Sequence, residues 1–225
     1  MDRSILETLV RDRAKKRAVV LATRLMDGIQ KLVYPTDKQD ENWLIEATHE
    51  VLASDKGRVV AGPDGDWFLN PFNPPLRLLL VGAVHIAQPL SRIGALSGYD
   101  VTVIDPRTSF ASEERFPDVN LMTDWPDEAM NALAPDARTA IVTLTHDPKL
   151  DDPALQAALR SPAFYIGALG SKKTHAARVA RLAEAGFGEN EIARIHGPVG
   201  LSIGAKSPAE IAISIMAEIT ETLRT

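Results

Sequence analysis

The segment RLLLVGAVHIAQPL, residues 77–90, has the form of a nucleotide-binding unit, in which an apolar strand leads through a glycine turn into a helix. A dinucleotide-binding turn has the pattern G-x-G-x-x-G, and its three positions are occupied here by Gly82, Val84 and Ala87. Gly82 suits the tight turn and Ala87 suits close helix packing, but Val84 is β-branched where the backbone must approach a pyrophosphate. The helix N-terminus still offers N–H groups and a positive dipole end to an anion. Two interpretations stay open, a phosphate-bearing ligand or a tight turn without one.

A carboxylate and a guanidinium follow the next apolar strand. Asp105 lies 23 residues after Gly82, close to the spacing at which a dinucleotide fold places the acid that binds a ribose hydroxyl. Arg107 follows and could meet a 2′-phosphate instead. The structural alternative is an Asp-Pro turn with a solvated arginine. Because position and chemistry agree, we favour ligand binding for this pair.

Thr145, His146 and Asp147 follow a third apolar strand, TAIVTLTH. A histidine beside a carboxylate at a sheet edge could form an acid–base pair, bind a metal, or contact a phosphate or a ring. The alternative is that Asp147 only caps the turn before Pro148. No metal site is predicted, since no two of the four histidines near expected strand ends have the i, i+4 spacing of a ligand pair. These are His85, His146, His175 and His196.

The stretch YIGALGSKKTHAARVARL forms a second expected loop between a strand and a helix. Its glycines loosen the backbone, a hydroxyl caps the helix, and two lysines carry charge where the helix dipole is already positive. An anionic ligand would relieve that repulsion, whereas the alternative is that both lysines point to water. We favour the anion site. The residues are Gly167 and Gly170, Ser171 or Thr174 as the cap, and Lys172 and Lys173.

A third glycine-rich stretch, HGPVGLSIGAKSPAEIA, precedes the last expected helix. Ser207 and Glu210 form a capping box with Pro208 at the first helical position, so this part predicts a helix start. The glycines before it, Gly197, Gly200 and Gly204, predict either a loop whose amides face a ligand or a loop packed against another chain.

These candidates all lie at the ends of strands in a regular pattern. After residue 75, apolar strand-like runs alternate with helical patterns, which predicts an α/β fold, a Rossmann-like, doubly wound parallel sheet covered on both faces. Ligands in such folds bind beyond the carboxyl ends of the strands. The expected strands are 76–82, 100–105, 119–123, 139–146, 163–169 and 193–198, and the expected helices are 86–97, 126–133, 151–160, 172–187 and 207–223.

The part before this pattern has a different character. NPFNPPL, residues 70–76, holds three prolines in seven residues and predicts a boundary. We therefore expect a small α+β domain over residues 1–73 and the Rossmann-like domain over residues 74–225. In the first, the sequence predicts a helix at 5–16, a hairpin about Asp27-Gly28, a helix at 42–54, and a hairpin turning at Pro63-Asp64-Gly65.

Composition narrows the function further. The chain has 225 residues and a formal net charge of −5, with acids and bases interspersed, so we predict neither nucleic-acid binding nor membrane attachment. The N-terminal stretch carries acids and no apolar signal core, which predicts a cytoplasmic protein. The chain has no cysteine, which excludes disulfides, thiolate metal sites and any covalent relay on its own thiol.

The glycine-rich stretches carry a family resemblance. FYIGALGSKKTHAARVARLAEAGF, followed by ARIHGPVGLSIGAKSPAEIAISIMAEI, resembles the C-terminal domain of the XdhC/CoxI family, accessory proteins for the maturation of molybdenum hydroxylases such as xanthine dehydrogenase. RLLLVGAVHIAQPL and VTVIDPR are similar to that family's Rossmann-like start, and the likeness covers about two-thirds of the chain, from Pro74 onward. The N-terminal third departs, because ATRLMDGIQKLVYP and DENWLIEATHEVL replace the Gly-Ser-Ser-Pro and Gly-Gly-Cys-Val-Glu stretches that members often show.

The resemblance implies transient binding of the molybdenum cofactor, a pterin carrying a phosphate or nucleotide, and help with its sulfuration and insertion into an apo molybdenum hydroxylase. Without cysteine, the sulfur would come from a separate cysteine desulfurase. It implies a homodimer that contacts its client transiently and is not itself a turnover enzyme. By position, the implied binding residues are Gly82, His85, Asp105, His146, Gly167, Ser171, Lys172, Gly200 and Gly204.

Two other functions fit parts of the sequence. An NAD(P)-dependent oxidoreductase would use the same loops, although Val84 counts against it and the Rossmann-like part has no clear Tyr-x-x-x-Lys or catalytic His–Asp arrangement beyond His146-Asp147. A scaffold protein without a ligand would suit the motif-poor N-terminal third, although the C-terminal glycine loops argue against that.

Overall fold

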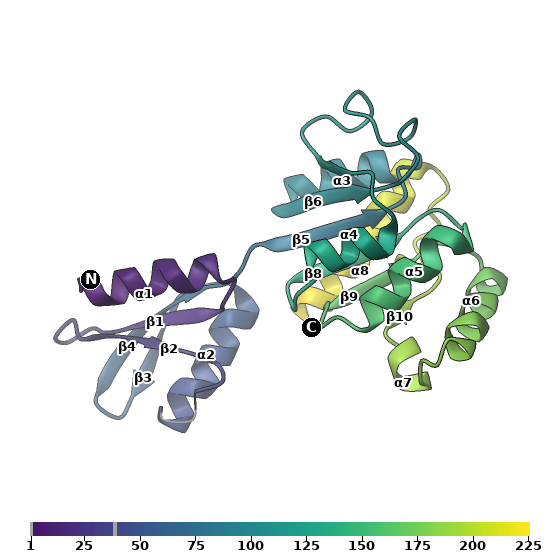
Figure 1. Cartoon of the computed structure of the whole chain (residues 1–225). Helices are drawn as coiled ribbons and strands as arrows, with labels where there is room; N and C mark the ends of the chain where they lie inside the picture. The colour runs from purple at the N-terminus through teal and green to yellow at the C-terminus, as the bar shows by residue number, and fades with distance from the viewer. Residues whose placement is uncertain (1, 38–39) are drawn as a thin grey trace. The chain divides into compact units, whose positions relative to one another are not determined.

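The computed structural model describes residues 2–37 and 40–225. The chain divides into two compact units, one ending at Pro75 and the other starting at Leu76, each with its own core (Figure 1). We describe each unit by itself.

The N-terminal unit is an antiparallel sheet with two helices, as the sequence predicted. Its strands are ordered β2-β1-β4-β3, and both hairpins form at the expected turns. The helix α2 buries Leu44, Ala47 and Val51 against strand residues such as Val20 and Leu69. The elements are α1 (Arg3–Ala14), β1 (Val19–Arg24), β2 (Gln30–Val33), α2 (Asn42–Ser54), β3 (Arg58–Gly62) and β4 (Gly65–Phe72).

The C-terminal unit confirms the predicted doubly wound parallel sheet. Its strands are ordered β10-β9-β8-β5-β6-β7, and every pairing is parallel. This is the strand order of dinucleotide-binding folds, and the direction of winding reverses between β5 and β8. The elements are β5 (Leu76–Val81), α3 (Ala87–Leu96), β6 (Tyr99–Ile104), β7 (Asn120–Met122), α4 (Pro126–Leu133), β8 (Thr139–Thr143), α5 (Pro148–Leu159), β9 (Tyr165–Ala168), α6 (Lys172–Glu184), α7 (Glu189–Ile192), β10 (Ile195–His196) and α8 (Pro208–Arg224).

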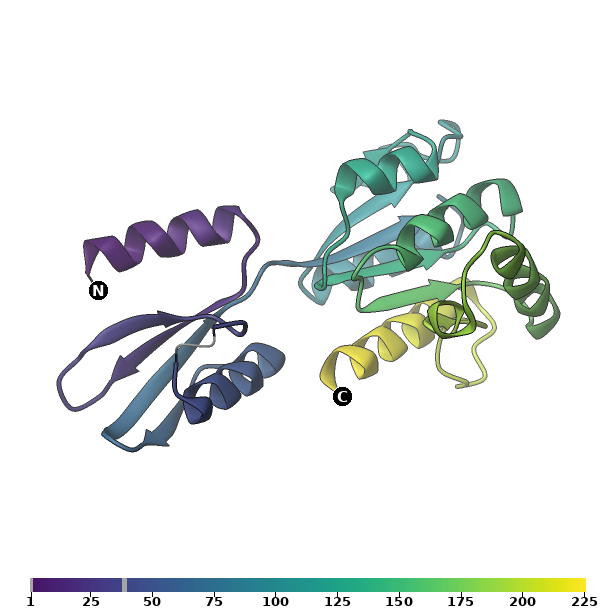
Figure 2. The same ribbon diagram turned by 60° about the horizontal axis from the view of Figure 1, so that its bottom comes forward.

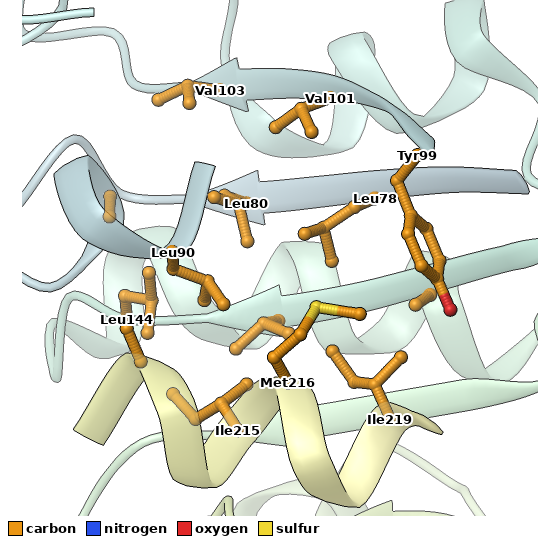
Figure 3. Packing of buried hydrophobic residues seen from close by; sticks show 14 of the residues in the cluster. Leu78, Leu80, Leu90, Tyr99, Val101, Val103, Leu144, Ile215, Met216 and Ile219 are labelled. Carbon is orange, nitrogen blue, oxygen red and sulfur yellow. The ribbon is translucent and has the colours of Figure 1, made fainter. Parts of the chain in front are cut away.

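Helices cover both faces of this sheet, which explains why its strands are continuously apolar (Figure 2). Successive side chains of a strand point to opposite faces, so Leu78 and Leu80 pack toward α3 and α8. Figure 3 shows these two residues above Ile215 and Ile219 of α8. On the other face, strand residues such as Leu79 pack against α4, α5 and α6.

The start of α8 follows the sequence prediction closely. The Ser207 hydroxyl accepts a hydrogen bond from the Glu210 amide, and the Glu210 carboxylate accepts one from the Ser207 amide. The sequence prediction missed α7, a single turn at whose start the Glu191 carboxylate accepts a hydrogen bond from the amide of the N-cap residue, Gly188. Within the described residues, no helix combines the length and the apolar run that crossing a bilayer requires.

Candidate functional site

The candidate site is the carboxyl edge of the parallel sheet, where segments following β5, β6, β8 and β9 meet (Figure 1). The winding reverses between β5 and β8, and this is the place where doubly wound folds bind ligands. The segments that follow β5 and β8 are therefore the first to consider.

Gly82 directly follows β5 in a conformation that only glycine adopts easily, with φ of +108°. Its amide donates to the Ile104 carbonyl oxygen at 2.8 Å. A Cβ built on Gly82 would lie 2.4 Å from Cγ2 of Thr145, which follows β8. Gly82 thus allows the β5 turn to pack directly against the β8 end.

Asp105 holds this turn in place. It is completely buried, and its carboxylate accepts hydrogen bonds from the Ala83 amide at 2.8 Å and from the Arg107 side chain at 2.7 and 2.8 Å. Burial opposes ionisation, but these hydrogen bonds hold the pKa of Asp105 below its ordinary value. A ribose contact through Asp105 stays a prediction, and it would require one of these bonds to be exchanged.

Arg107 is the exposed member of the pair, with 39 % of its side chain accessible. The hydrogen bond to Asp105, opposed by burial, raises the pKa of Arg107, and the charges of Asp147 and Asp151 add to the effect. Arg107 therefore lies within the electrostatic reach of the segment after β8, across the β5 turn.

The connection from β6 to β7 supplies two residues that sequence reasoning missed. Arg115 donates to the Ala83 carbonyl oxygen at 2.9 Å, and the Arg107 guanidinium lies 4.5 Å from the centre of the Phe110 ring. Ala83 thus has its N–H bound by Asp105 and its carbonyl bound by Arg115. The Ala83 amide, which could otherwise bind a phosphate, is therefore already occupied by Asp105. The β-branched side chain of Val84 is a second obstacle to a phosphate in this turn. Arg115 and Phe110 lie in an aperiodic stretch, so no spacing signal marked them.

The segment after β8 exposes His146 in the left-handed region, with φ of +62°. Asp147 caps α5 by accepting from the Lys149 amide at 3.0 Å, which is the structural role left open for it. The buried Asp151 holds this segment in place by accepting hydrogen bonds from the Thr145 hydroxyl at 2.6 Å and from the His146 amide at 3.0 Å.

Asp151 also connects this segment to the next one, a role the sequence did not indicate. It is 1 % exposed, and its Oδ2 lies 3.7 Å from Nη2 of Arg178, which is 1 % exposed as well. The same Nη2 donates to the Leu169 carbonyl oxygen, directly after β9. Burial raises the pKa of Asp151, and the hydrogen bonds from Thr145 and the charge of Arg178 act in the opposite direction.

At the start of α6 the cap is Ser171, whose hydroxyl accepts from the Thr174 amide at 3.1 Å. Lys172 follows as the first helical residue and is exposed. The sequence placed Gly167 both within the strand expected over 163–169 and in this loop; the loop placement was wrong, because Gly167 lies inside β9 and is buried. Its missing side chain makes room for Val199, whose Cγ2 would lie 2.5 Å from an added Cβ.

The third glycine segment consists of two parts with different surroundings. The Gly200 amide donates to Glu218 of α8 at 2.8 Å, so this part is fixed to the helix. Gly204 lies in the exposed part, and no atom approaches within 4 Å of the position of its missing Cβ. Of the two glycines, only Gly204 lies in backbone that is open to a ligand or a partner.

The structure separates the four histidines. His85 and His146 are exposed at the carboxyl edge, whereas His175 packs against Gly197 and His196 stacks on the Tyr165 ring at 4.6 Å. In the part of the chain that the structure describes, no group of three acidic, histidine or cysteine side chains has an arrangement suited to a metal ion.

His175 gives stability a pH dependence. Burial lowers the pKa of His175, and the positive charge of Arg178 lowers it further. As the pH falls, the His175 side chain therefore takes up a proton more readily in the unfolded chain than in the folded one. The free energy of unfolding keeps its full value above about pH 6.5 and decreases as the pH falls below it. Calorimetric melting between about pH 7 and pH 5 should show a declining Tm in the wild type and a flatter profile in His175→Gln. The exposed His85→Gln is the control and should keep the wild-type profile; equal slopes in all three proteins would contradict this role of His175.

A family model described as the XdhC Rossmann domain matches residues 78–219, which span the sheet and all of its strand ends. The chain belongs to this family. The resemblance seen in the glycine-rich stretches is confirmed.

Relatives of this XdhC-family chain include two curated proteins of Escherichia coli (strain K12). The uncharacterized protein YqeB is 34 % identical over 145 residues, which are 64 % of this chain and 27 % of YqeB. The molybdenum cofactor insertion chaperone PaoD is 32 % identical over 157 residues, 68 % of this chain and 43 % of PaoD. A probable xanthine dehydrogenase subunit from Bacillus subtilis (strain 168) is 33 % identical over 156 residues, 69 % of this chain and 45 % of the relative. The chain matches less than half the length of each of these relatives.

A solved structure shares the fold. The crystal structure of a xanthine dehydrogenase from Bacillus halodurans superposes with a TM-score of 0.70 at 23 % identity, covering 99 % of this chain and 64 % of the other. At this identity the likeness concerns the fold alone.

Proposed function

We propose that this XdhC-family chain is an accessory protein that holds the molybdenum cofactor as cargo and assists its insertion into a molybdenum hydroxylase such as a xanthine dehydrogenase. The observation that carries the proposal is the family match over residues 78–219, together with PaoD, a named molybdenum cofactor insertion chaperone, among the relatives. The cargo lies at the carboxyl edge of the sheet.

The chemistry of that edge suits a pterin that carries a phosphate. The helices α5 and α6 both begin there, and their N-termini favour negative charge. Lys172 adds a cation at the start of α6, and Arg107 supplies an exposed guanidinium across the β5 turn. His146, exposed on a segment fixed by Asp151, contacts polar groups of the ring or sugar. Closing protein around the cargo excludes water and oxidants.

The remaining parts of the proposal concern sulfur and partners. Since the chain has no cysteine, sulfuration of the cargo takes its sulfur from a separate cysteine desulfurase. Cargo release requires an apo-enzyme surface, and we propose a cytoplasmic homodimer that meets this client transiently. The chain then acts without turnover of its own.

The NAD(P)-dependent oxidoreductase is the second candidate, because the strand order is that of dinucleotide-binding folds. Two observations count against it. The Ala83 amide is bound by Asp105, and Asp105 is buried rather than open to a ribose. The scaffold alternative predicts no ligand at this edge at all.

Replacing Lys172 with glutamate tests the cargo site. The charge reversal at the N-terminus of α6 should weaken cofactor binding by roughly 1–2 kcal/mol, about 5- to 30-fold in Kd. Activation of an apo molybdenum hydroxylase by cofactor-loaded protein should fall with it. Lys56→Glu, the same charge change at an exposed position of the N-terminal unit, is the control. If both variants deliver cofactor equally well, Lys172 is not part of the site.

A further inference from the structure

Arg178 is a charged side chain buried in the C-terminal unit with most of its hydrogen-bonding capacity unused. It is 1 % exposed, and within the described residues its guanidinium makes a single hydrogen bond, from Nη2 to the Leu169 carbonyl oxygen at 2.8 Å. Nε and Nη1 are inaccessible to solvent and have no partner among the residues that the structure describes. Buried donors without a partner are costly, so these two groups favour the binding of an acceptor.

Two other arginines of the same unit show what a structural role looks like. Arg194 donates to three carbonyl oxygens beyond the end of α5 or within its last turn. Arg77 donates to two carbonyl oxygens at the end of α4 and to the Thr139 hydroxyl, and within the described residues only its Nε has no partner. Both arginines therefore donate hydrogen bonds to carbonyl oxygens that the C-terminal ends of helices leave free. Among the residues that the structure describes, Arg178 binds no carbonyl oxygen at the end of a helix, and the carboxylate beside it, Asp151, lies 3.7 Å away with its oxygens bound to Thr145 and His146.

The guanidinium lies between the starts of two helices. Long side chains of a helix lean toward its N-terminus, and Arg178 accordingly reaches the Leu169 carbonyl oxygen, just before the Ser171 cap of α6. Asp151 on its other side belongs to the first turn of α5. One turn before Arg178, Nδ1 of His175 is also buried and without a partner in the described part of the chain.

We propose that Arg178 is the receptor of an oxyanion subsite, of the size and charge of a phosphate, between the N-terminal turns of α5 and α6. Its free groups are donors only, and a guanidinium pairs with phosphate oxygens through several hydrogen bonds at once. The positive ends of two helices and the nearby Lys172 favour the same charge. Because Nε and Nη1 are inaccessible to solvent, an anion reaches them only when the atoms around them move aside.

This inference deepens the proposed function, since the phosphate of the pterin cargo is one source of such an oxyanion. The other source is free inorganic phosphate. Both sources present the same oxyanion, and a competition experiment distinguishes them. If the subsite holds the phosphate of the cargo, inorganic phosphate displaces the cargo; if it holds free phosphate, retention of the cargo is unchanged.

The test is titration of the full chain with inorganic phosphate in an oxyanion-free buffer, followed by calorimetry and by the shift in Tm. The wild type should bind phosphate, and Arg178→Met should bind it at least about tenfold more weakly. The methionine keeps the apolar stem but leaves Asp151 without its buried counter-charge, so the variant is less stable, and circular dichroism checks that it is folded at the temperature of the titration. Arg178→Lys, which keeps the charge but loses the planar donor set, should fall between the two.

Arg194→Met is the matched control. It removes a half-buried arginine that donates to three carbonyl oxygens and should keep the wild-type affinity for phosphate. Absence of phosphate binding in the wild type, or equal affinity in the wild type and Arg178→Met, would overturn the proposal. Either result leaves the proposed function intact if the chain still retains the pterin cofactor, whereas phosphate binding without cofactor retention would reject the proposed function and keep the subsite.

Discussion

Replacing Asp151 with alanine is expected to lower the free energy of unfolding by about 3–5 kcal/mol, because it removes one partner of a buried pair of charges. The carboxylate is 1 % exposed and lies 3.7 Å from Nη2 of the buried Arg178. It also accepts hydrogen bonds from Thr145 and His146, whose donors would lose their partner. Urea denaturation followed by circular dichroism measures the loss.

The neighbouring Asp152 provides the control for this prediction. Asp152 pairs with Arg181 at 2.5 and 2.9 Å, but 38 % of the arginine side chain is exposed. Asp152→Ala should therefore cost only about 1 kcal/mol or less. A second check is the double variant Asp151→Ala/Arg178→Met, which removes both charges and should lose at least about 1 kcal/mol less than the sum of the single changes. If Asp151→Ala loses less than about 1 kcal/mol, Asp151 does not hold the segment after β8 and Arg178 together.

Replacing Gly82 with alanine is expected to cost about 2–5 kcal/mol, from two separate sources. A side chain at φ of +108° strains the backbone, at roughly 1–2 kcal/mol, and the new Cβ would lie 2.4 Å from Cγ2 of Thr145, at roughly 1–3 kcal/mol more. The clash pushes the β5 and β8 ends apart, so cofactor retention should fall as well. Thermal and chemical denaturation, with cofactor binding measured on the folded fraction, give the two effects.

Two variants separate strain from clash. Gly98 has φ of +86° and open space at its Cβ position, so Gly98→Ala should show the backbone strain alone, about 1–2 kcal/mol. Thr145→Ser removes the atom that Gly82→Ala meets while keeping the hydroxyl that Asp151 accepts from. The Gly82→Ala/Thr145→Ser protein should recover the part of the loss due to the clash. Equal losses for Gly82→Ala and Gly98→Ala would show that the close approach to Thr145 does not matter.

The fold of the C-terminal unit could be predicted because its sequence patterns are local. Continuous apolar runs such as Leu78 to Val81 indicate strands buried on both faces, and the intervening helices have clear starts, as at Ser207. The strand ends follow from these runs. The alternation of strands and helices predicts a parallel sheet, in which the carboxyl ends of all strands lie at one edge. This is why the sequence could predict that four residues approach that edge: Gly82, Arg107, His146 and Lys172.

What the sequence could not reveal depends on contacts between distant segments. Asp151 in the first turn of a helix has the position of an ordinary dipole-stabilising acid, and nothing local indicates that it is buried against Arg178. Arg115 lies in a loop without periodicity, and its bond to Ala83 depends on how that loop folds back. Gly167 was counted with the loop although the strand expected over 163–169 contains it, because the glycine-rich run does not mark where the strand ends; Gly167 lies inside β9 and packs against Val199.

The most direct test of the proposed function is native mass spectrometry of the full chain after incubation with the molybdenum cofactor and, separately, with NAD(P)H. We expect a mass increase equal to the bound pterin cofactor, reduced in Lys172→Glu and retained in Lys56→Glu. Retention of the nicotinamide with hydride turnover, and no retention of the pterin, would contradict the proposed function.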